Sequence, residues 1–569
     1  MPTVPSGGDV LRRAISGQRR DVAVGSLLGA AHQAGEALVP VLIGVTIDRG
    51  VAEGNLGALL TLLAVLAVVY VGLSFGFRFG ARAGERAAER AGHDLRVQLV
   101  ERVLHPGGGT EDGRLPGALA AIATEDARRV GAVNMAVLSG LSALAGLLVG
   151  AVVLLRISLP LGLMVLIGTP VLLWLGHLLS KPLERRSEAE QERAAHASGV
   201  AADLVAGLRV LKGIGAEAAA VARYRRTSRD SLAATVRAAR AEALSSGTVL
   251  ALTGTFIAVV ALVGGRLAAQ GDISLGQLVS AVGLAMFLLG PLEVLSWVTT
   301  ELAQGRASAA RVAGVLATPP AVAPASGRPA RPVRGELLLR GVTHGGLRDL
   351  DLRVAPGEFL GVAATDPADA TALLQCLSRE ADPAAGTVEL DGVPFPGLAP
   401  AALRTAVLVA PHDADLFEDT LLANVTPPPE PPGDDGPAAD VYAAMAAAGM
   451  DEVARTAPRG LATPVSEGGR SLSGGQRQRV ALARALAAGR PVLVVHDPTT
   501  AVDAVTEARI AAGLREFRRG RTTIVVTTSP ALLAATDRVA LLDGGRVAGT
   551  GPHADLIRRH PGYRAAVLS

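Results

Sequence analysis

The sequence predicts an all-α membrane domain of six spanning helices, followed by a soluble α/β domain. Three observations support this fold class. Hydrophobic residues make up 49% of the 569 residues and charged residues only 19%. The long apolar stretches all lie in the first 300 residues or so, and the remainder changes to short apolar strands that alternate with helices. A chain of this length also exceeds what one hydrophobic core can organise.

Six apolar stretches each reach the roughly 20 residues that a helix needs to cross a bilayer. We place them at about 22–47, 56–79, 133–155, 157–180, 246–269 and 275–299. The connections after the second and fourth stretches are long and rich in Arg, and the N-terminal segment is basic as well. The positive-inside rule therefore places the N-terminus and both long connections in the cytoplasm.

Both long connections have the composition of helices that extend beyond the membrane. Ala81–Val103 and Glu184–Arg240 are dense in Ala, Glu, Arg and Leu, with few glycines and no proline. We therefore expect each of these segments to be largely continuous helix that projects into the cytoplasm.

The composition also indicates where the domains divide. The membrane domain is expected over 1–317, a linker rich in Pro, Ala and Arg over 318–334, and the α/β domain over 335–569. Strands are predicted at Glu336–Leu339, Leu360–Ala363 and Val492–Val495. A second proline-rich stretch, Thr426–Pro437, is expected to be a surface insertion.

Composition excludes several kinds of protein. A net charge of +3 is close to neutral for this length, so we expect no nucleic-acid partner. The single cysteine, Cys376, excludes a disulfide within the chain and a cysteine metal cluster, and no other metal site is expected. The segment 1–20 is polar and basic, without the apolar core of a cleavable signal. The high content of Ala, Gly, Arg and Val is typical of a GC-rich, bacterial genome.

The strongest motif is Leu472-Ser473-Gly474-Gly475-Gln476, which leads into a basic and then apolar run that ends at Leu486. A serine and two glycines at a helix start expose backbone N–H groups and a hydroxyl to an anion. Such a triplet alone would usually be a turn. The whole fifteen-residue run, however, resembles the signature motif of ATP-binding cassette (ABC) proteins.

The resemblance covers nearly the whole chain. Pro356-Gly357-Glu358 resembles the approach to the phosphate loop, Thr499–Asp503 resembles the D-loop, and Leu208–Glu217 resembles the second cytoplasmic coupling segment of the membrane half. This resemblance implies an exporter-type half-transporter with a P-loop-type nucleotide-binding domain, and ATP and Mg²⁺ as cofactors. It also implies that segments at about 105–117 and 208–217 couple the two domains.

The phosphate loop departs from the family pattern. That loop needs Gly-x-x-x-x-Gly-Lys-Ser/Thr, because the glycines let the backbone wrap the phosphates, Lys neutralises them and the hydroxyl holds Mg²⁺. The register places Ala364 and Asp369 at the two glycines and Ala370 at the lysine, so only Thr371 is kept for a weak site. We expect Asp369 to put a negative charge where a phosphate would lie.

Four further positions of the same site have changed. His496 stands where the family has its Mg²⁺-coordinating Asp, and Asp497 replaces the catalytic Glu with a side chain one methylene shorter. His412 takes the Gln-loop position and Thr528 that of the catalytic His. No catalytic set is therefore expected to be intact in this chain's own site, and the chain alone is expected to have little or no ATPase activity.

The intact signature implies a partner. In this family the signature of one subunit closes over ATP held by the other. The resemblance thus implies that Ser473, Gly474, Gly475 and Gln476, together with Asp503 of the D-loop, serve ATP bound by a second half-transporter with an intact phosphate loop.

Polar residues inside membrane spans are costly, so they are candidates for function. Gln33 and Glu36 lie in the first span, with His32 on the same helix face as Glu36, and Glu293 lies in the sixth. We expect Gln33, Glu36 and Glu293 to line a cavity for an unidentified small-molecule substrate. The alternative is that they only pack helices or line a hydrated wall.

Three functions stay open from the sequence. The first is export of a small or amphipathic molecule by a heterodimer in the plasma membrane, with the bilayer and a second half-transporter as partners. The second is import of a metal chelate or siderophore on the same fold. The third is a non-hydrolysing regulatory membrane subunit. The intact signature and Val210–Glu217 favour the two transporters.

Overall fold

The computed structural model describes residues 5–110, 113–413, 415–427 and 440–568. The chain divides into two compact units. The first comprises Met1–Val100 and Pro116–Ala317, and the second comprises Glu101–Leu115 and Thr318–Ser569. Most of the second proline-rich stretch, which we predicted to be a surface insertion, lies outside the described residues.

The first unit is helical throughout its described residues. Its helices are α1 (Gly7–Gly17), α2 (Arg19–Thr46), the π-helical turn η1 (Ile47–Ala52), α3 (Leu56–Val103), α4 (Pro116–Ala121), the π-helical turn η2 (Ile122–Asp126), α5 (Ala127–Ile157), α6 (Leu159–Ala206), α7 (Leu208–Gly213), α8 (Glu217–Gln270), α9 (Leu275–Phe287) and α10 (Leu289–Leu316). Six of the described helical segments are long and apolar enough to cross a membrane, which confirms the predicted six spans.

Small residues let the membrane helices approach closely. Helix α5 packs along both α2 and α10, and α2 also packs against α9. Where α2 meets α9, a Cβ on Gly44 would lie 2.2 Å from the Gly276 carbonyl oxygen, so this crossing has no room for a side chain. The Asp48 carboxylate follows on the same side of the crossing, and it accepts hydrogen bonds from Ser274 Oγ at 2.5 Å and the Gly276 amide at 2.8 Å.

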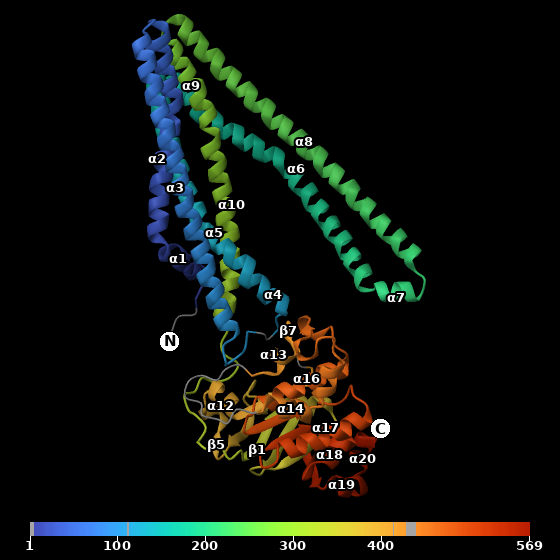
Figure 1. Ribbon diagram of the computed structural model, residues 1–569. Helices are drawn as coiled ribbons and strands as arrows, with labels where there is room; N and C mark the ends of the chain where they lie inside the picture. Colours follow the sequence, from blue (N-terminus) through green and yellow to red (C-terminus); the bar gives the residue numbers. More distant parts are fainter. Residues whose placement is uncertain (1–4, 111–112, 414, 428–439, 569) are drawn as a thin grey trace. The chain divides into compact units, whose positions relative to one another are not determined.

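Both segments predicted to be largely continuous helix are mainly helical, but the second is interrupted twice. Ala81–Val103 is continuous helix, since it forms the end of α3. Glu184–Arg240 is not continuous: α6 ends at Ala206, α7 is a short separate helix, and α8 begins only at Glu217. The break between α7 and α8 contains Gly215, which adopts φ 65°, in the left-handed backbone region that commonly ends helices. Helices α6 and α8 pack along each other on either side of α7 (Figure 1).

The described residues of the second unit form three sheets. Its strands are β1 (Leu337–His344), β2 (Leu347–Val354), β3 (Phe359–Ala364), β4 (Ala385–Leu390), β5 (Val393–Pro394), β6 (Val407–Ala410), β7 (Asp419–Thr420), β8 (Pro464–Val465), β9 (Val492–His496), β10 (Thr523–Val526), β11 (Arg538–Asp543) and β12 (Arg546–Gly551). The sheet orders are β12-β11-β3-β10-β9-β6, β2-β1-β4-β5 and β7-β8. The three predicted strands correspond to β1, β3 and β9.

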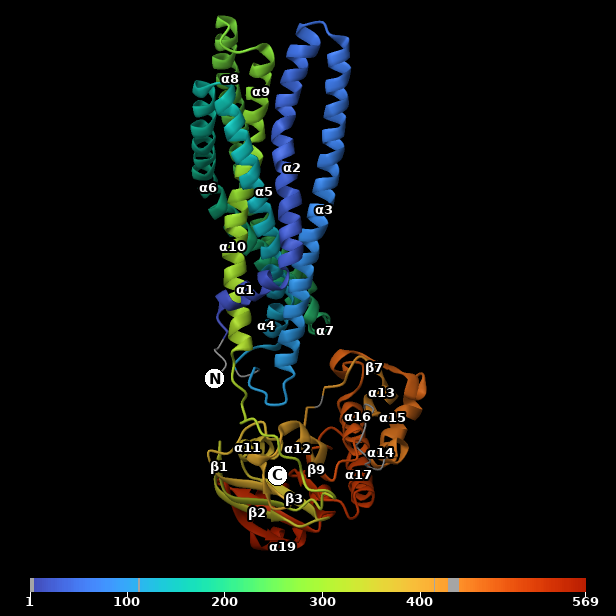
Figure 2. The same cartoon turned by 90° about the vertical axis from the view of Figure 1, so that its left-hand side faces the viewer.

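Helices cover these sheets. They are α11 (Pro367–Leu377), α12 (Pro400–Ala406), α13 (Leu421–Val425), α14 (Val441–Ala447), α15 (Met450–Thr456), α16 (Gly474–Ala487), α17 (Ala504–Phe517), α18 (Pro530–Ala534), α19 (His553–Arg559) and α20 (Pro561–Leu568), with the 3₁₀ turns η3 (Phe395–Gly397), η4 (Gly460–Ala462) and η5 (Glu467–Gly469). Helices α13–α17 gather on one side of the unit (Figure 2). Strands β3, β6, β9 and β10 run parallel, so their carboxyl ends meet at one edge, where ligands bind in such sheets.

The segment Glu101–Leu115 is bound to the start of the linker. The Arg102 guanidinium donates to the Thr318 carbonyl at 2.7 Å and to the Gly108 carbonyl at 3.2 Å. The Ala321 amide donates to the Gly107 carbonyl at 2.9 Å. The part of the chain predicted to hold the first coupling segment is therefore fastened to the linker by both side-chain and backbone hydrogen bonds.

Candidate functional site

The loop between β3 and α11 stands at the phosphate-loop position, and its polar groups are engaged within the chain. Asp366 caps α11, because its Oδ1 accepts from the Ala368 amide at 2.8 Å. The Thr371 hydroxyl, predicted to be the one retained phosphate-loop group, donates to the Pro367 carbonyl at 3.0 Å. The Asp366 carboxylate thus accepts the hydrogen bond of a backbone N–H at the helix start that could otherwise bind a phosphate.

The position of the Asp369 side chain corrects the prediction that its charge would face a bound phosphate. Its side chain is 4% exposed, and its Oδ2 accepts a 2.8 Å hydrogen bond from the buried Gly545 amide. A Cβ on Gly346 would lie 2.2 Å from its Oδ1, so the carboxylate fills the space that glycine leaves. Asp369 is therefore a buried anchor between α11 and two turns. Ala370, at the lysine position, is also 4% exposed and belongs to the core.

The remaining altered positions gather at the carboxyl ends of β6, β9 and β10. His412 follows β6, and its Nδ1 lies 3.2 Å from the Asp497 carbonyl. The His412 and His496 rings lie edge to face with centroids 6.0 Å apart, and His496 Nε2 lies 3.6 Å from Asp497 Oδ2. Asp497 adopts φ 42°, an uncommon backbone conformation for a residue with a side chain. Thr528, beyond β10, is exposed.

Burial lowers the pKa of His496, and a positive charge on His412 would lower it further, against the opposing attraction of Asp497. A neutral imidazole replaces the carboxylate oxygen that Mg²⁺ prefers. Within the described part of the chain, no group of three or more His, Cys, Asp or Glu side chains could hold a metal ion. His412 and His496 thus place imidazole nitrogens, rather than oxygens, at two of the altered positions.

The signature has the geometry of an anion-binding helix start. Ser473 caps the fourteen-residue α16, and its hydroxyl accepts from the Gln476 amide at 3.3 Å while Gln476 Oε1 accepts from the Ser473 amide at 2.9 Å. Gly474 and Gly475 form the first helical positions. Their backbone N–H groups are the unpaired donors that a helix presents to an anion.

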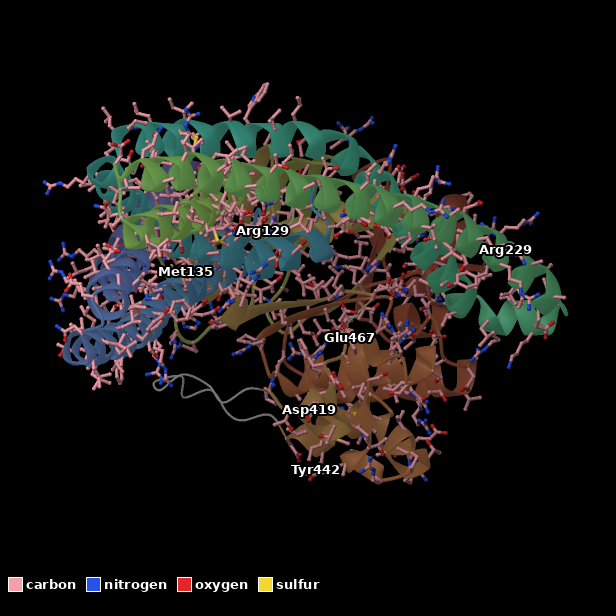
Figure 3. The ribbon with its side chains drawn as sticks, turned by 90° about the horizontal axis from the view of Figure 1, so that it is seen from above. Arg129, Met135, Arg229, Asp419, Tyr442 and Glu467 are labelled. Atoms are coloured by element: carbon pink, nitrogen blue, oxygen red, sulfur yellow. The ribbon has the colours of Figure 1, made fainter. Side chains whose placement is uncertain are left out.

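The signature and the D-loop touch within the chain. A Cβ on Gly475 would lie 2.5 Å from the Ala501 carbonyl oxygen, so only glycine fits there without a shift. Gln478, a contact that sequence reasoning missed, donates to Thr500 Oγ1 at 2.7 Å and accepts from the Ala501 amide at 2.9 Å. A cavity of about 430 Å³ is lined by this region and by His412. Figure 3 labels Glu467, which stands in η5 just before the signature.

Asp503 has a role in the chain's own structure. Its Oδ1 accepts from the Val505 and Thr506 amides at 3.1 and 2.9 Å, so it caps α17, and the hydrogen bond from the Thr506 backbone is the main reason that the pKa of Asp503 is lowered. Contact with a partner's nucleotide remains an expectation for this residue.

In the first unit, one cavity brings together the three polar residues that were expected to line a substrate cavity. Its volume is about 620 Å³, and Gln33, Glu36 and Glu293 line it. The sequence prediction missed Phe287 and Trp297 on the same wall. The spacing of four residues from Glu293 to Trp297, which places both on one helix face, is the signal that could have identified Trp297.

Comparisons with known proteins agree with this arrangement. Residues 22–292 match the family described as the ABC transporter transmembrane region, and residues 347–500 match the ABC transporter family. The ATP-dependent lipid A-core flippase of Burkholderia orbicola is 30% identical over 410 residues, which cover 71% of this chain and 68% of that protein. The chain belongs to the ABC transporter family.

Other likenesses cover more of the chain. The ATP-dependent lipid A-core flippase of Burkholderia thailandensis is 28% identical over 551 residues, 94% of this chain and 91% of that protein. A multidrug efflux ATP-binding/permease protein of Mycobacterium tuberculosis is 33% identical over 482 residues, 83% of this chain. The matched segment spans 40% of that mycobacterial protein's length. A bacterial Atm1-family ABC exporter with ATP bound shares the fold, with a TM-score of 0.71 at 24% identity over 98% of this chain and 99% of that one.

Proposed function

We propose that the chain is one half of an ATP-driven exporter of a small or amphipathic molecule, in the plasma membrane of a bacterium. Its six candidate spans and basic N-terminus support a multi-pass protein with the N-terminus and the second unit in the cytoplasm. The efflux and flippase names of its relatives favour export over import of a metal chelate.

We propose further that the functional form is a heterodimer. The observation that carries this is the contrast between the two halves of the ATP-handling machinery in one chain. The phosphate-loop position holds a buried Asp369 and Ala370, whereas Ser473, Gly474 and Gly475 keep an open helix start. A second half-transporter supplies the intact phosphate loop, and this chain's signature closes over the ATP that it binds. This chain's own loop holds nucleotide weakly or without turnover.

In this proposal, closure of the two nucleotide-binding domains drives the membrane helices. Closure pulls on the segments at about 105–117 and 208–217, and the helices change from inward-open to outward-open; hydrolysis at the partner's site then resets them. The driving free energy is the difference in ATP affinity between the closed and open states, since ATP that bound both states equally would shift nothing.

The test is the ATPase activity of the purified chain, alone and together with a candidate partner half-transporter that has an intact phosphate loop. We expect the chain alone to be inactive and the pair to be active. Ser473→Ala should reduce the activity of the pair roughly tenfold or more, because one charge-stabilising donor is lost. Thr420→Ala is the matched control, since Thr420 also caps a helix but lies outside the signature.

The outcomes separate the alternatives. Brisk hydrolysis by the chain alone would show that the altered phosphate loop is competent and would refute the heterodimer. A pair whose activity is unchanged by Ser473→Ala would refute the role of the signature and would leave the chain as a regulatory subunit.

A further inference from the structure

The cavity in the first unit has a chemistry that selects its ligand. It lies between α2 on one side and the end of α9 with the start of α10 on the other, and its volume is about 620 Å³. That volume accommodates a drug-sized molecule. The wall combines acidic side chains, a polar amide and large apolar side chains, and each of these makes a separate demand on the ligand.

The charged groups on the wall are acidic. Glu36 and Glu293 line the cavity, and none of the described lining residues is basic. His32 lies beside Glu36, with its Nε2 3.7 Å from the carboxylate. Its Nδ1 lies 2.9 Å from the Leu73 carbonyl, which can only accept, so Nδ1 carries a proton. Two carboxylates within an apolar helix bundle attract a cation and repel an anion.

The wall also has a buried acceptor that lacks a donor. Gln33 Oε1 is buried without a hydrogen-bond partner among the described residues. Buried acceptors without partners are costly, and a ligand that brings N–H donors would relieve that cost.

The rest of the wall is apolar and aromatic. Met286, Phe287 and Trp297 line the cavity, and Met286 is 55% and Trp297 44% exposed. An indole face attracts a cation, and a thioether adapts to irregular apolar surfaces. The ligand therefore needs an apolar body in addition to its positive charge.

We infer that this cavity binds an amphipathic cation whose charged nitrogen bears an N–H, with that nitrogen between Glu36 and Glu293, its N–H on Gln33 Oε1 and the apolar body against Phe287 and Trp297. The inference deepens the proposed export function, because it names the class of molecule that the same cavity would take.

Direct binding to the full chain in phosphatidylcholine nanodiscs, without nucleotide, tests the inference. The chain has two tryptophans, so Trp174→Phe leaves Trp297 as the reporter on the cavity wall. The probes are rhodamine 6G, an aromatic cation with N–H donors, tetraphenylphosphonium, a cation without them, and fluorescein, an anionic dye. Quenching of Trp297 fluorescence gives the Kd of each probe.

We expect rhodamine 6G to bind more tightly than tetraphenylphosphonium and fluorescein not to bind measurably. Glu36→Gln and Glu293→Gln should each weaken rhodamine 6G binding roughly tenfold, because each removes one charge at close range. Glu301→Gln is the matched control, since Glu301 lies on α10 but does not line the cavity. Gln33→Glu should tighten the binding of rhodamine 6G. If the two glutamine variants do not fold, this increase in affinity is the measurement that tests the inference.

Each opposite result overturns a stated part of the inference. Equal binding of fluorescein, or an unchanged Kd in both glutamine variants, refutes the cation site. Equal binding of tetraphenylphosphonium refutes the need for N–H donors, and unchanged or weaker binding in Gln33→Glu refutes the role of the amide oxygen. Binding as expected, without ATP-dependent transport by the pair, would refute the proposed function and leave this inference standing.

Discussion

Replacing Asp369 by Ala tests whether this residue is a structural anchor rather than a charge set against phosphate. The change removes a carboxylate that is 4% exposed and leaves the buried Gly545 amide without its 2.8 Å acceptor. A hydrogen bond to a charged group contributes about 1.5–3 kcal/mol, and leaving its buried partner unsatisfied adds to the loss. We therefore expect the free energy of unfolding of the second unit to fall by about 2–3 kcal/mol. For a unit of this size the melting temperature should fall by roughly 4–12 °C.

Cys376 provides the assay, because it is the chain's single cysteine and is buried in the core of the second unit. A thiol-reactive dye therefore reports the unfolding of that unit during a thermal ramp. Asp369→Asn is the matched control: it keeps an acceptor for Gly545 and should cost less than about 1 kcal/mol. If Asp369→Ala melts at or above the temperature of the parent protein, the carboxylate is not an anchor and the original expectation of a charge facing phosphate returns.

The remaining predictions concern the signature, the linker and pH. Gly475→Ala should destabilise the second unit by about 1–3 kcal/mol, because the new Cβ would lie 2.5 Å from the Ala501 carbonyl oxygen. Gly474→Ala is the control and should be near neutral, because its Cβ would meet only the Ala501 methyl group at 3.3 Å. Equal melting temperatures of the two variants would contradict this prediction. Arg102→Ala should cost about 1.5–3 kcal/mol through the loss of its hydrogen bonds to two carbonyls, and an unchanged denaturant midpoint would show that they contribute nothing. Burial raises the pKa of the Cys376 thiol to about 11. The folded state then holds more protons than the unfolded state between roughly pH 8.5 and 11, so the free energy of unfolding should fall as the pH rises through this window. Cys376→Val should flatten the plot of the free energy of unfolding against pH, measured by denaturation at a series of pH values. An identical slope in the variant would refute the assignment to Cys376.

The sequence predicted the six spans and the order of the two domains because both depend on local patterns. A long apolar run specifies a span without reference to any other part of the chain. The strands β3 and β9 were predictable for the same reason, since a buried parallel strand is a short, continuous apolar run. The breaks on either side of α7 were not predicted, because glycines such as Gly215 were outweighed by the many helix formers around them.

The candidate sites were predicted in part. The signature and the altered phosphate loop follow from residue identity at fixed spacing, so position alone could find them. The surroundings of Asp369 could not be found in this way, because its partner Gly545 lies 176 residues further along the chain. The same limit applies to the membrane cavity: Gln33 and Glu293 are separate polar residues in the sequence, and only the packing of α2 against α9, which is followed by α10, places them on one wall.

The fifteen residues of Glu101–Leu115 leave the first unit and return to it, so the polypeptide passes between the units three times: at Val100, at Pro116 and at Ala317. A single proteolytic cut in the linker would therefore not release the second unit from the first. A recombinant fragment that begins at Thr318 would also lack this segment, and the Ala321 amide would lose the Gly107 carbonyl that it binds. For this protein, the nucleotide-binding domain delimited by sequence and the compact unit of the structure are different pieces of chain, and biochemical dissection should follow the second.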